Sequence, residues 1–138
     1  MDKIVTSIAE MHLDEDGILI VEMLPGINVT LERSREYLAA TNQFLDGRKA
    51  LILFDASAEY TITEEAKAFG TSDAFISNRI AIAFVTRSIA NRLMFNLYLT
   101  VYKPAIPTKM FSSRNSALKW LKSFYVMPGD KFVKPGKK

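Results

Sequence analysis

Three short apolar runs alternate with helix-like segments between residues 51 and 121, and this alternation constrains the fold more than any other feature of the chain. The runs cover residues 50–54, 80–85 and 109–111. Strands that are apolar at consecutive positions are typical of a sheet with helices on both faces. Strands separated by helices run parallel, because the helix carries the chain back across the sheet. The sequence therefore predicts an α/β fold.

Further elements are predicted on both sides of these runs. Residues 4–11 and 18–24 flank the turn-forming residues 14–17, which predicts an antiparallel hairpin. Helices are expected at residues 30–45, 61–77, 88–102 and 113–124. The predicted order is β-β-α-β-α-β-α-β-α, a mixed five-stranded sheet with four helices.

Composition indicates a single domain. The 138 residues suffice for one core without a metal or a disulfide. The chain holds no cysteine, which excludes thiol nucleophiles and cysteine-based metal sites and fits a reducing compartment. No apolar stretch approaches the roughly 18 residues of a membrane span, and no signal-peptide pattern opens the sequence. We expect a soluble, cytoplasmic domain over residues 1–127 and a basic, flexible tail over residues 128–138.

Charge is unevenly distributed along the sequence. Residues 1–65 carry 13 acidic and 5 basic side chains, whereas residues 66–138 carry 2 acidic and 13 basic ones. A nucleic-acid-binding protein needs bases gathered on one face together with elements that read the nucleic acid, which the sequence does not indicate. Neutralisation of one half by the other within the fold is the simpler interpretation. Nucleic-acid binding is therefore not expected.

The order of elements and two short stretches resemble the STAS superfamily. The stretches are the strand end at residues 54–57, with a polar linker to a helix capped at Thr63, and the closing segment at residues 110–121. This superfamily includes anti-sigma-factor antagonists, the tails of sulfate transporters, and stand-alone relatives that share a core with Sec14-type lipid carriers. The resemblance spans residues 4–124. It implies a non-enzymatic regulatory or protein-interaction module.

One property of that superfamily does not carry over to this chain. In its antagonist members, Asp-Ser-Ser-Gly opens a helix, and one serine there is phosphorylated to switch partner binding. The matching residues 61–66 read Thr-Ile-Thr-Glu-Glu-Ala, without a serine. Thr61 or Thr63 could accept a phosphate, but Glu64 would repel its charge and already suits the positive end of a helix. Capping is the favoured interpretation of this candidate regulatory loop of Thr61, Thr63 and Glu64.

The carboxyl ends of three predicted strands carry a candidate anion site. Ligands of open α/β sheets lie beyond these ends, where hydroxyls, arginines and free helix amides can bind an anion. The candidate residues are Asp55, Ser57, Thr86, Arg87, Ser88, Ser113 and Arg114. Arg87 and Arg114 would hold a phosphate or a carboxylate together. In the alternative interpretation, Ser88 and Ser113 are ordinary helix caps and the arginines pair with Asp55, Glu59 or solvent.

The predicted helix at residues 88–102 has more apolar surface than one sheet can bury. Its polar stripe consists of Arg92, Asn96, Thr100 and Lys103. The remaining circumference is apolar and much wider than the arc of roughly 100° that an amphipathic helix needs, so a second apolar partner is indicated. A homodimer is the first candidate, the final helix or another protein the second, and a lipid chain or membrane surface the third. The predicted interface residues are Met94, Phe95, Tyr98 and Tyr102, with burial in the chain's own core as the alternative.

The sequence lacks the residue patterns of an active site. His12 is the only histidine, and no second ligand or nucleophile lies at metal-site or triad spacing from it. No glycine-rich phosphate loop is present. We expect no enzymatic activity, metal or cofactor. The two remaining hypotheses are a homodimeric interaction module of STAS type and, alternatively, a small anionic-ligand or lipid-binding domain that uses the strand ends.

Overall fold

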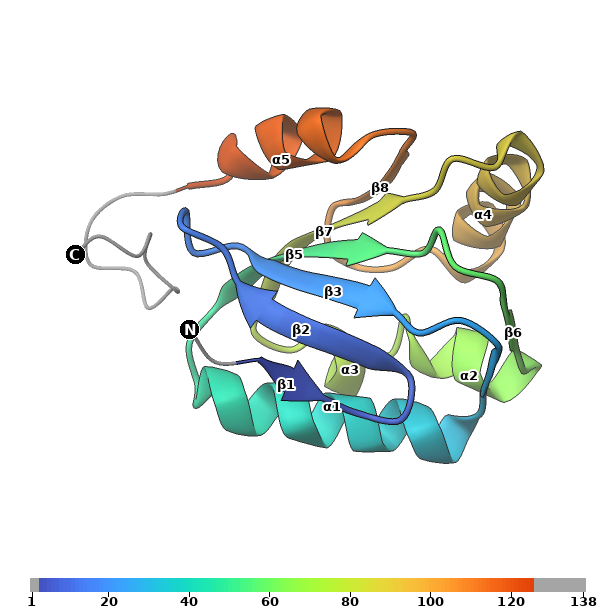
Figure 1. The fold of residues 1–138 in the computed structure, drawn as a ribbon, viewed down its shortest axis with the longest axis horizontal. Coiled ribbons are helices and arrows are strands. Elements are labelled where there is room, and N and C mark those ends of the chain that lie inside the picture. Colours follow the sequence, from blue (N-terminus) through green and yellow to red (C-terminus); the bar gives the residue numbers. More distant parts are fainter. Residues whose placement is uncertain (1–2, 126–138) are drawn as a thin grey trace.

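A six-stranded mixed sheet forms the centre of the computed structural model, which describes residues 3–125. The strand order is β1-β2-β3-β5-β7-β8 (Figure 1). The strands are β1 (Ile4–Val5), β2 (Ala9–Leu13), β3 (Leu19–Met23), β5 (Ala50–Asp55), β7 (Arg79–Val85) and β8 (Thr108–Phe111). Strands β1 to β3 pair antiparallel, and β3, β5, β7 and β8 pair parallel. The predicted mixed α/β fold is confirmed.

Helices cover both faces of this sheet. The helices are α1 (Leu31–Leu45), α2 (Glu64–Phe69), α3 (Asp73–Ile76), α4 (Ile89–Tyr102) and α5 (Arg114–Lys122). Tyr37 of α1 and Ala66 of α2 belong to one buried cluster with Val21 and Ile52 of the sheet. Leu121 of α5 belongs to a second cluster on the other face. Helices α1 and α5 accordingly lie on opposite sides of the molecule, whereas α4 contacts the edge strand β8 (Figure 1).

The first predicted strand is two strands in the structure. Thr6 N donates to Ala9 O at 2.9 Å, and the Thr6 hydroxyl accepts hydrogen bonds from the amides of Ile8 and Ala9, both at 3.3 Å. These bonds turn the chain between β1 and β2, so the sheet has six strands rather than five. Alternating residues cannot reveal this turn, because a threonine hydroxyl that satisfies turn amides looks in sequence like any strand threonine.

The predicted helix at residues 61–77 is also divided. Helix α2 stops at Gly70, and the Ser72 hydroxyl then caps α3 by accepting from Phe75 N at 3.3 Å. Just before α2, β6 (Tyr60–Ile62) pairs parallel with β4 (Ile27–Val29) in a separate two-stranded sheet that the sequence did not predict. The structure therefore has five helices within residues 3–125. The predicted tail at residues 128–138 lies outside the described residues.

Candidate functional site

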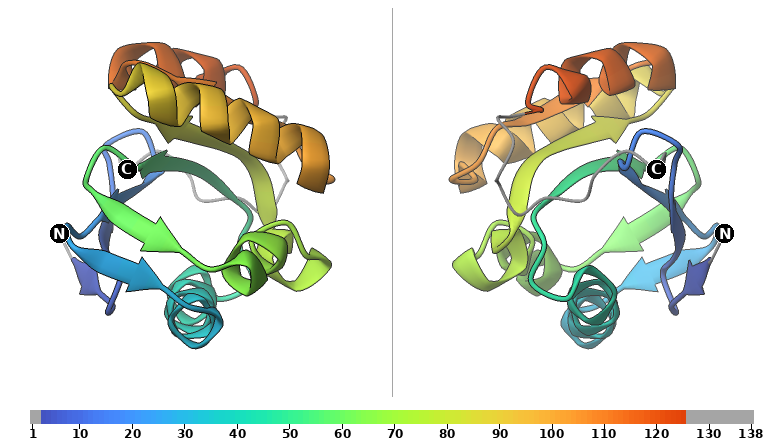
Figure 2. Two further views of the ribbon diagram at one scale, coloured as in Figure 1. Left: turned by 90° about the vertical axis from the view of Figure 1, so that its right-hand side faces the viewer. Right: turned by 90° about the vertical axis from the view of Figure 1, so that its left-hand side faces the viewer.

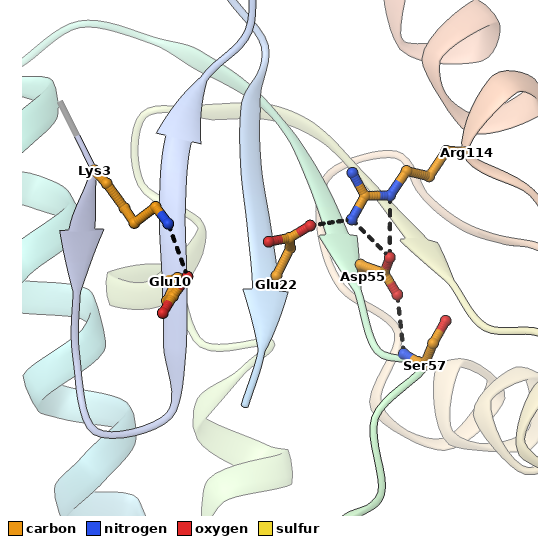
Figure 3. A network of polar contacts seen from close by, with 6 residues as sticks. All are labelled: Lys3, Glu10, Glu22, Asp55, Ser57 and Arg114. Carbon is orange, nitrogen blue, oxygen red and sulfur yellow. Dashed lines mark hydrogen bonds and ion pairs between the residues drawn. The ribbon is translucent and has the colours of Figure 1, made fainter. Parts of the chain in front are cut away.

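Arg114 joins two neighbouring strands near the carboxyl edge of the sheet. It is the first residue of α5, and its Nε and Nη2 atoms donate to Asp55 Oδ2 at 3.1 and 2.8 Å. Its Nη2 also donates to Glu22 Oε2 at 2.5 Å (Figure 3). The parallel register of β3 and β5 sets Glu22 opposite Asp55, so one guanidinium reaches both carboxylates. This cluster holds two negative charges and one positive charge.

Asp55 is the most shielded member of the cluster. Its side chain is 18% exposed, and Ser57 N donates to Asp55 Oδ1 at 3.0 Å. Burial alone raises the pKa of the Asp55 carboxyl, but hydrogen bonds from Ser57 and Arg114 outweigh burial and place that pKa below its ordinary value. For Arg114, burial lowers the pKa, and the two carboxylates raise it by more. Both groups are therefore charged at neutral pH.

An open hollow of about 280 Å³ adjoins this cluster. Its polar lining comes from Asp55, Ser57, Arg87, Ser112, Ser113, Arg114 and Asn115. The structure thus brings together five of the seven predicted strand-end residues, and Arg87 is exposed there. Arg114 faces the hollow already paired with two carboxylates, which leaves less positive potential for an added anion.

Thr86 and Ser88 do not line the hollow. Thr86 is buried, and its hydroxyl accepts from Ser88 N at 3.3 Å. Ser88 caps α4 by accepting from Asn91 N at 3.1 Å, and Ser113 caps α5 in the same way. The alternative interpretation of these two serines as helix caps therefore agrees with the structure. Glu22 was missed by sequence reasoning, since only the register of β3 against β5 places it beside Arg114.

The residues of the candidate regulatory loop form hydrogen bonds within α2 and to β4 and α4. Thr63 caps α2, because its hydroxyl accepts from Ala66 N at 3.2 Å. Thr61 lies in β6 and donates to Asn28 Oδ1 at 2.8 Å. Glu64 Oε1 accepts from the Tyr102 hydroxyl at 2.9 Å, and this hydrogen bond is the main reason why the pKa of Glu64 is lowered. The loop therefore reaches α4 directly.

Helix α4 has one face against the protein and one face in solvent. Phe95 packs on Phe84 of β7 with ring centroids 4.3 Å apart, and the Tyr98 hydroxyl donates to Lys67 O at 2.8 Å. The Tyr102 hydroxyl donates to the carboxylate of Glu64 at 2.9 Å. Of the four predicted interface residues, only Met94 is exposed. The other three are half-buried against their own chain, because the aromatic side of α4 is the side that meets β7 and α2.

The outward face of α4 consists of other residues. They are Ile89, Leu93, Met94, Leu97 and Val101, each between 59% and 66% exposed. In the left view of Figure 2, α4 lies in front with no other element over it. No residue of this helix is buried, although most are apolar. An interface through α4 stays a prediction, but these five residues replace Phe95, Tyr98 and Tyr102 as its candidates.

Comparison with known proteins gives the family. The model of a family described as Domain of unknown function (DUF7793) matches residues 11–125, most of the chain. The chain belongs to this family. No curated protein matches the sequence of this DUF7793 protein.

One solved structure supports the fold of the DUF7793 chain. A crystal structure of an uncharacterised DUF3478 protein with a SpoIIAA-like fold, from Shewanella loihica PV-4, has a TM-score of 0.61. The two proteins are 14% identical, over 88% of this chain and 98% of that one. A protein of unknown function from Arthrobacter sp. FB24 is 22% identical over 81% of this chain and 97% of its own, with a TM-score of 0.29. The first likeness confirms the predicted STAS fold.

Within residues 3–125, no group of three or more His, Cys, Asp or Glu side chains is placed to hold a metal ion. Over the same residues, no helix has the length and apolar character needed to cross a membrane.

Proposed function

We propose that this DUF7793 protein is a non-enzymatic regulatory or protein-interaction module of STAS type that forms a homodimer through the outward face of α4. The observation that carries the proposal is the row of five large apolar side chains on that face, each more than half exposed. A contiguous apolar patch of this kind on a soluble domain typically marks an interface. A cytoplasmic location is part of the proposal, because a cysteine-free chain fits a reducing compartment.

The size of the patch supports a moderate affinity. A large apolar side chain contributes roughly 1.5–3 kcal/mol when it is fully buried. Five such side chains on each of two copies, with about 60% of each still to be buried, contribute on the order of 10–20 kcal/mol in all. Association costs about 4–15 kcal/mol in lost freedom. We therefore expect a dimer that dissociates in the micromolar range.

The strand-end residues give less support to an active site or to the alternative, a small anionic-ligand or lipid-binding domain. Asp55 and Glu22 are ion-paired with Arg114, and Ser113 is engaged as a helix cap. General acid-base chemistry needs carboxylates in contrasting environments, whereas these two share one cation. An anion in the hollow would rely mainly on Arg87, beside a cluster that is already negative in sum.

Light scattering on paired variants tests the proposal. Leu93→Asp and Leu97→Asp each place a charge in the middle of the outward face without touching the packed side of α4, so we expect both to be monomers. Val5→Asp is the control, because Val5 is 61% exposed in β1, at the opposite edge of the sheet from β8, the strand that α4 contacts. The control should dimerise like the native chain. Dimers of unchanged stability in both α4 variants would refute the proposed interface.

A further inference from the structure

The outward stripe of α4 has nearly the same composition when it is followed from either end. Ile89, Leu93, Leu97 and Val101 are spaced four residues apart and form one ridge of the helix surface. The β-branched residues lie at the two ends, the leucines lie in the middle, and the centre of the stripe is at position 95. A surface that is symmetric in this way can serve as both halves of a two-fold interface, in which each residue meets a different residue of the second copy.

Building on the proposed homodimer, we propose that two copies pack their α4 helices antiparallel about a two-fold axis opposite position 95. Leu93 then lies against the partner's Leu97, and Ile89 lies against the partner's Val101. Each leucine meets a leucine, and each β-branched side chain meets a β-branched one. The occupant of the outward face is a second copy of this chain.

The helix ends favour the antiparallel arrangement over the parallel one. Helix α4 has no acidic residue in its first turn, so no side chain of that turn neutralises the positive end of its dipole. A parallel pair would bring together the two positive helix ends, which repel one another. An antiparallel pair sets the positive end of each helix beside the negative end of the other.

The polar stripe of α4 is compatible with this arrangement. In an antiparallel two-fold pair, the same flank of both helices lies on one side of the contact. Asn96 is one position from the centre, so the two copies of Asn96 are about 3 Å apart along the helix axis, where their amides can donate to and accept from each other. Arg92 lies three positions before the centre, so its two copies are about 9 Å apart along the helix axis. This separation is close to the screening length in physiological salt, so the two positive charges repel one another only weakly.

Single-cysteine variants test the arrangement cleanly, because the native chain has no cysteine. A disulfide needs Cα atoms about 4.4–6.8 Å apart. In the antiparallel pair, positions 93 and 97 of opposite copies are within that range, whereas two copies of position 93 are offset by about 6 Å along the axis and fall outside it. In a parallel pair, each position would instead meet itself.

The experiment mixes a Leu93→Cys chain with a mass-tagged Leu97→Cys chain under mild oxidation. We expect the mixed disulfide to exceed either self-disulfide at least tenfold. Self-disulfides in excess would overturn the antiparallel arrangement, and so would the absence of any disulfide in a sample that light scattering shows to be dimeric. In both of these cases the homodimer itself stands. A monomer at every concentration tested would overturn the arrangement and the proposed function together.

Discussion

Arg114 at the start of α5 is bonded twice to Asp55 at the end of β5, with distances of 3.1 and 2.8 Å. These residues are 59 positions apart in the chain, and their contact ties helix α5 to an inner strand of the parallel part of the sheet. This contact engages Arg114, one of the two arginines that the sequence predicted as anion ligands. The contact is therefore better explained as a structural cross-link.

Replacing Arg114 should destabilise the fold. Arg114→Ala removes the hydrogen bonds to Asp55 and Glu22 and leaves the shielded Asp55 carboxylate without its cation. Since Arg114 is itself partly exposed, we expect a loss of about 1–2 kcal/mol in the free energy of unfolding. Urea denaturation measures this loss. Arg87→Ala is the matched control and should change that free energy by less than about 0.5 kcal/mol, because Arg87 is exposed. Equal losses in both variants would contradict the cross-link.

The Asp55 contact should make stability depend on acid pH. The pKa of Asp55 is lower in the folded chain than its ordinary value of 3.8. Its stabilising contribution is therefore fully present above that ordinary value and is lost as pH falls through the lower, folded pKa. Below pH 4, we expect the urea concentration at the unfolding midpoint to decrease more steeply with falling pH for the native chain than for Asp55→Asn. Parallel pH profiles for the two proteins would show that Asp55 contributes nothing to acid sensitivity.

Tyr98 should resist ionisation at alkaline pH. Burial raises the pKa of its phenol to about 12 from an ordinary value of 10.0, with a smaller contribution from neighbouring tyrosines. Since the folded pKa is the higher one, the stability linked to Tyr98 is present below pH 10 and is lost as pH rises toward 12. Absorbance titration should show a late tyrosinate step that Tyr98→Phe diminishes. This variant should also lose about 1 kcal/mol, because Lys67 O loses its donor.

Gly70 should be coupled energetically to Tyr98. A Cβ atom at Gly70 would lie 3.2 Å from the Tyr98 hydroxyl oxygen, closer than an ordinary contact. The backbone at Gly70 is in the right-handed helical region, so alanine fits there without backbone strain and stabilises by up to about 1 kcal/mol, because it restricts the unfolded chain. We expect Gly70→Ala to leave the free energy of unfolding of the native chain nearly unchanged. In a chain that already carries Tyr98→Phe, the same substitution should raise that free energy. A double-mutant cycle measures this coupling, and additive effects would argue against the close approach.

The sequence predicted those parts of the fold that depend on burial along the chain. Strands β5 and β7 are apolar at consecutive positions because both of their faces are covered, and the predicted runs correspond to them. The break at Thr6 escaped prediction, because local hydrogen bonds of its hydroxyl redirect the chain without changing the apolar pattern. The division at Gly70 was also missed, since Ser72 starts a new helix only once the first one has ended.

The candidate site was harder to predict because it depends on partners that are distant in the chain. The pairing of Glu22 with Arg114 follows from the register of β3 against β5, which composition does not encode. On α4 the sequence showed an excess of apolar side chains but not which of them meet the protein. Phe84 decides this by packing on Phe95, which turns Leu93 and Leu97 outward.

The molar mass of the native chain as a function of concentration tests the central claim most directly. Sedimentation equilibrium at a series of micromolar concentrations should show the mass rising from the 15.5 kDa of one chain toward twice that value. Under the same conditions Leu97→Asp should remain at the mass of one chain. A native chain that stays at 15.5 kDa throughout the series would contradict a homodimer formed through α4.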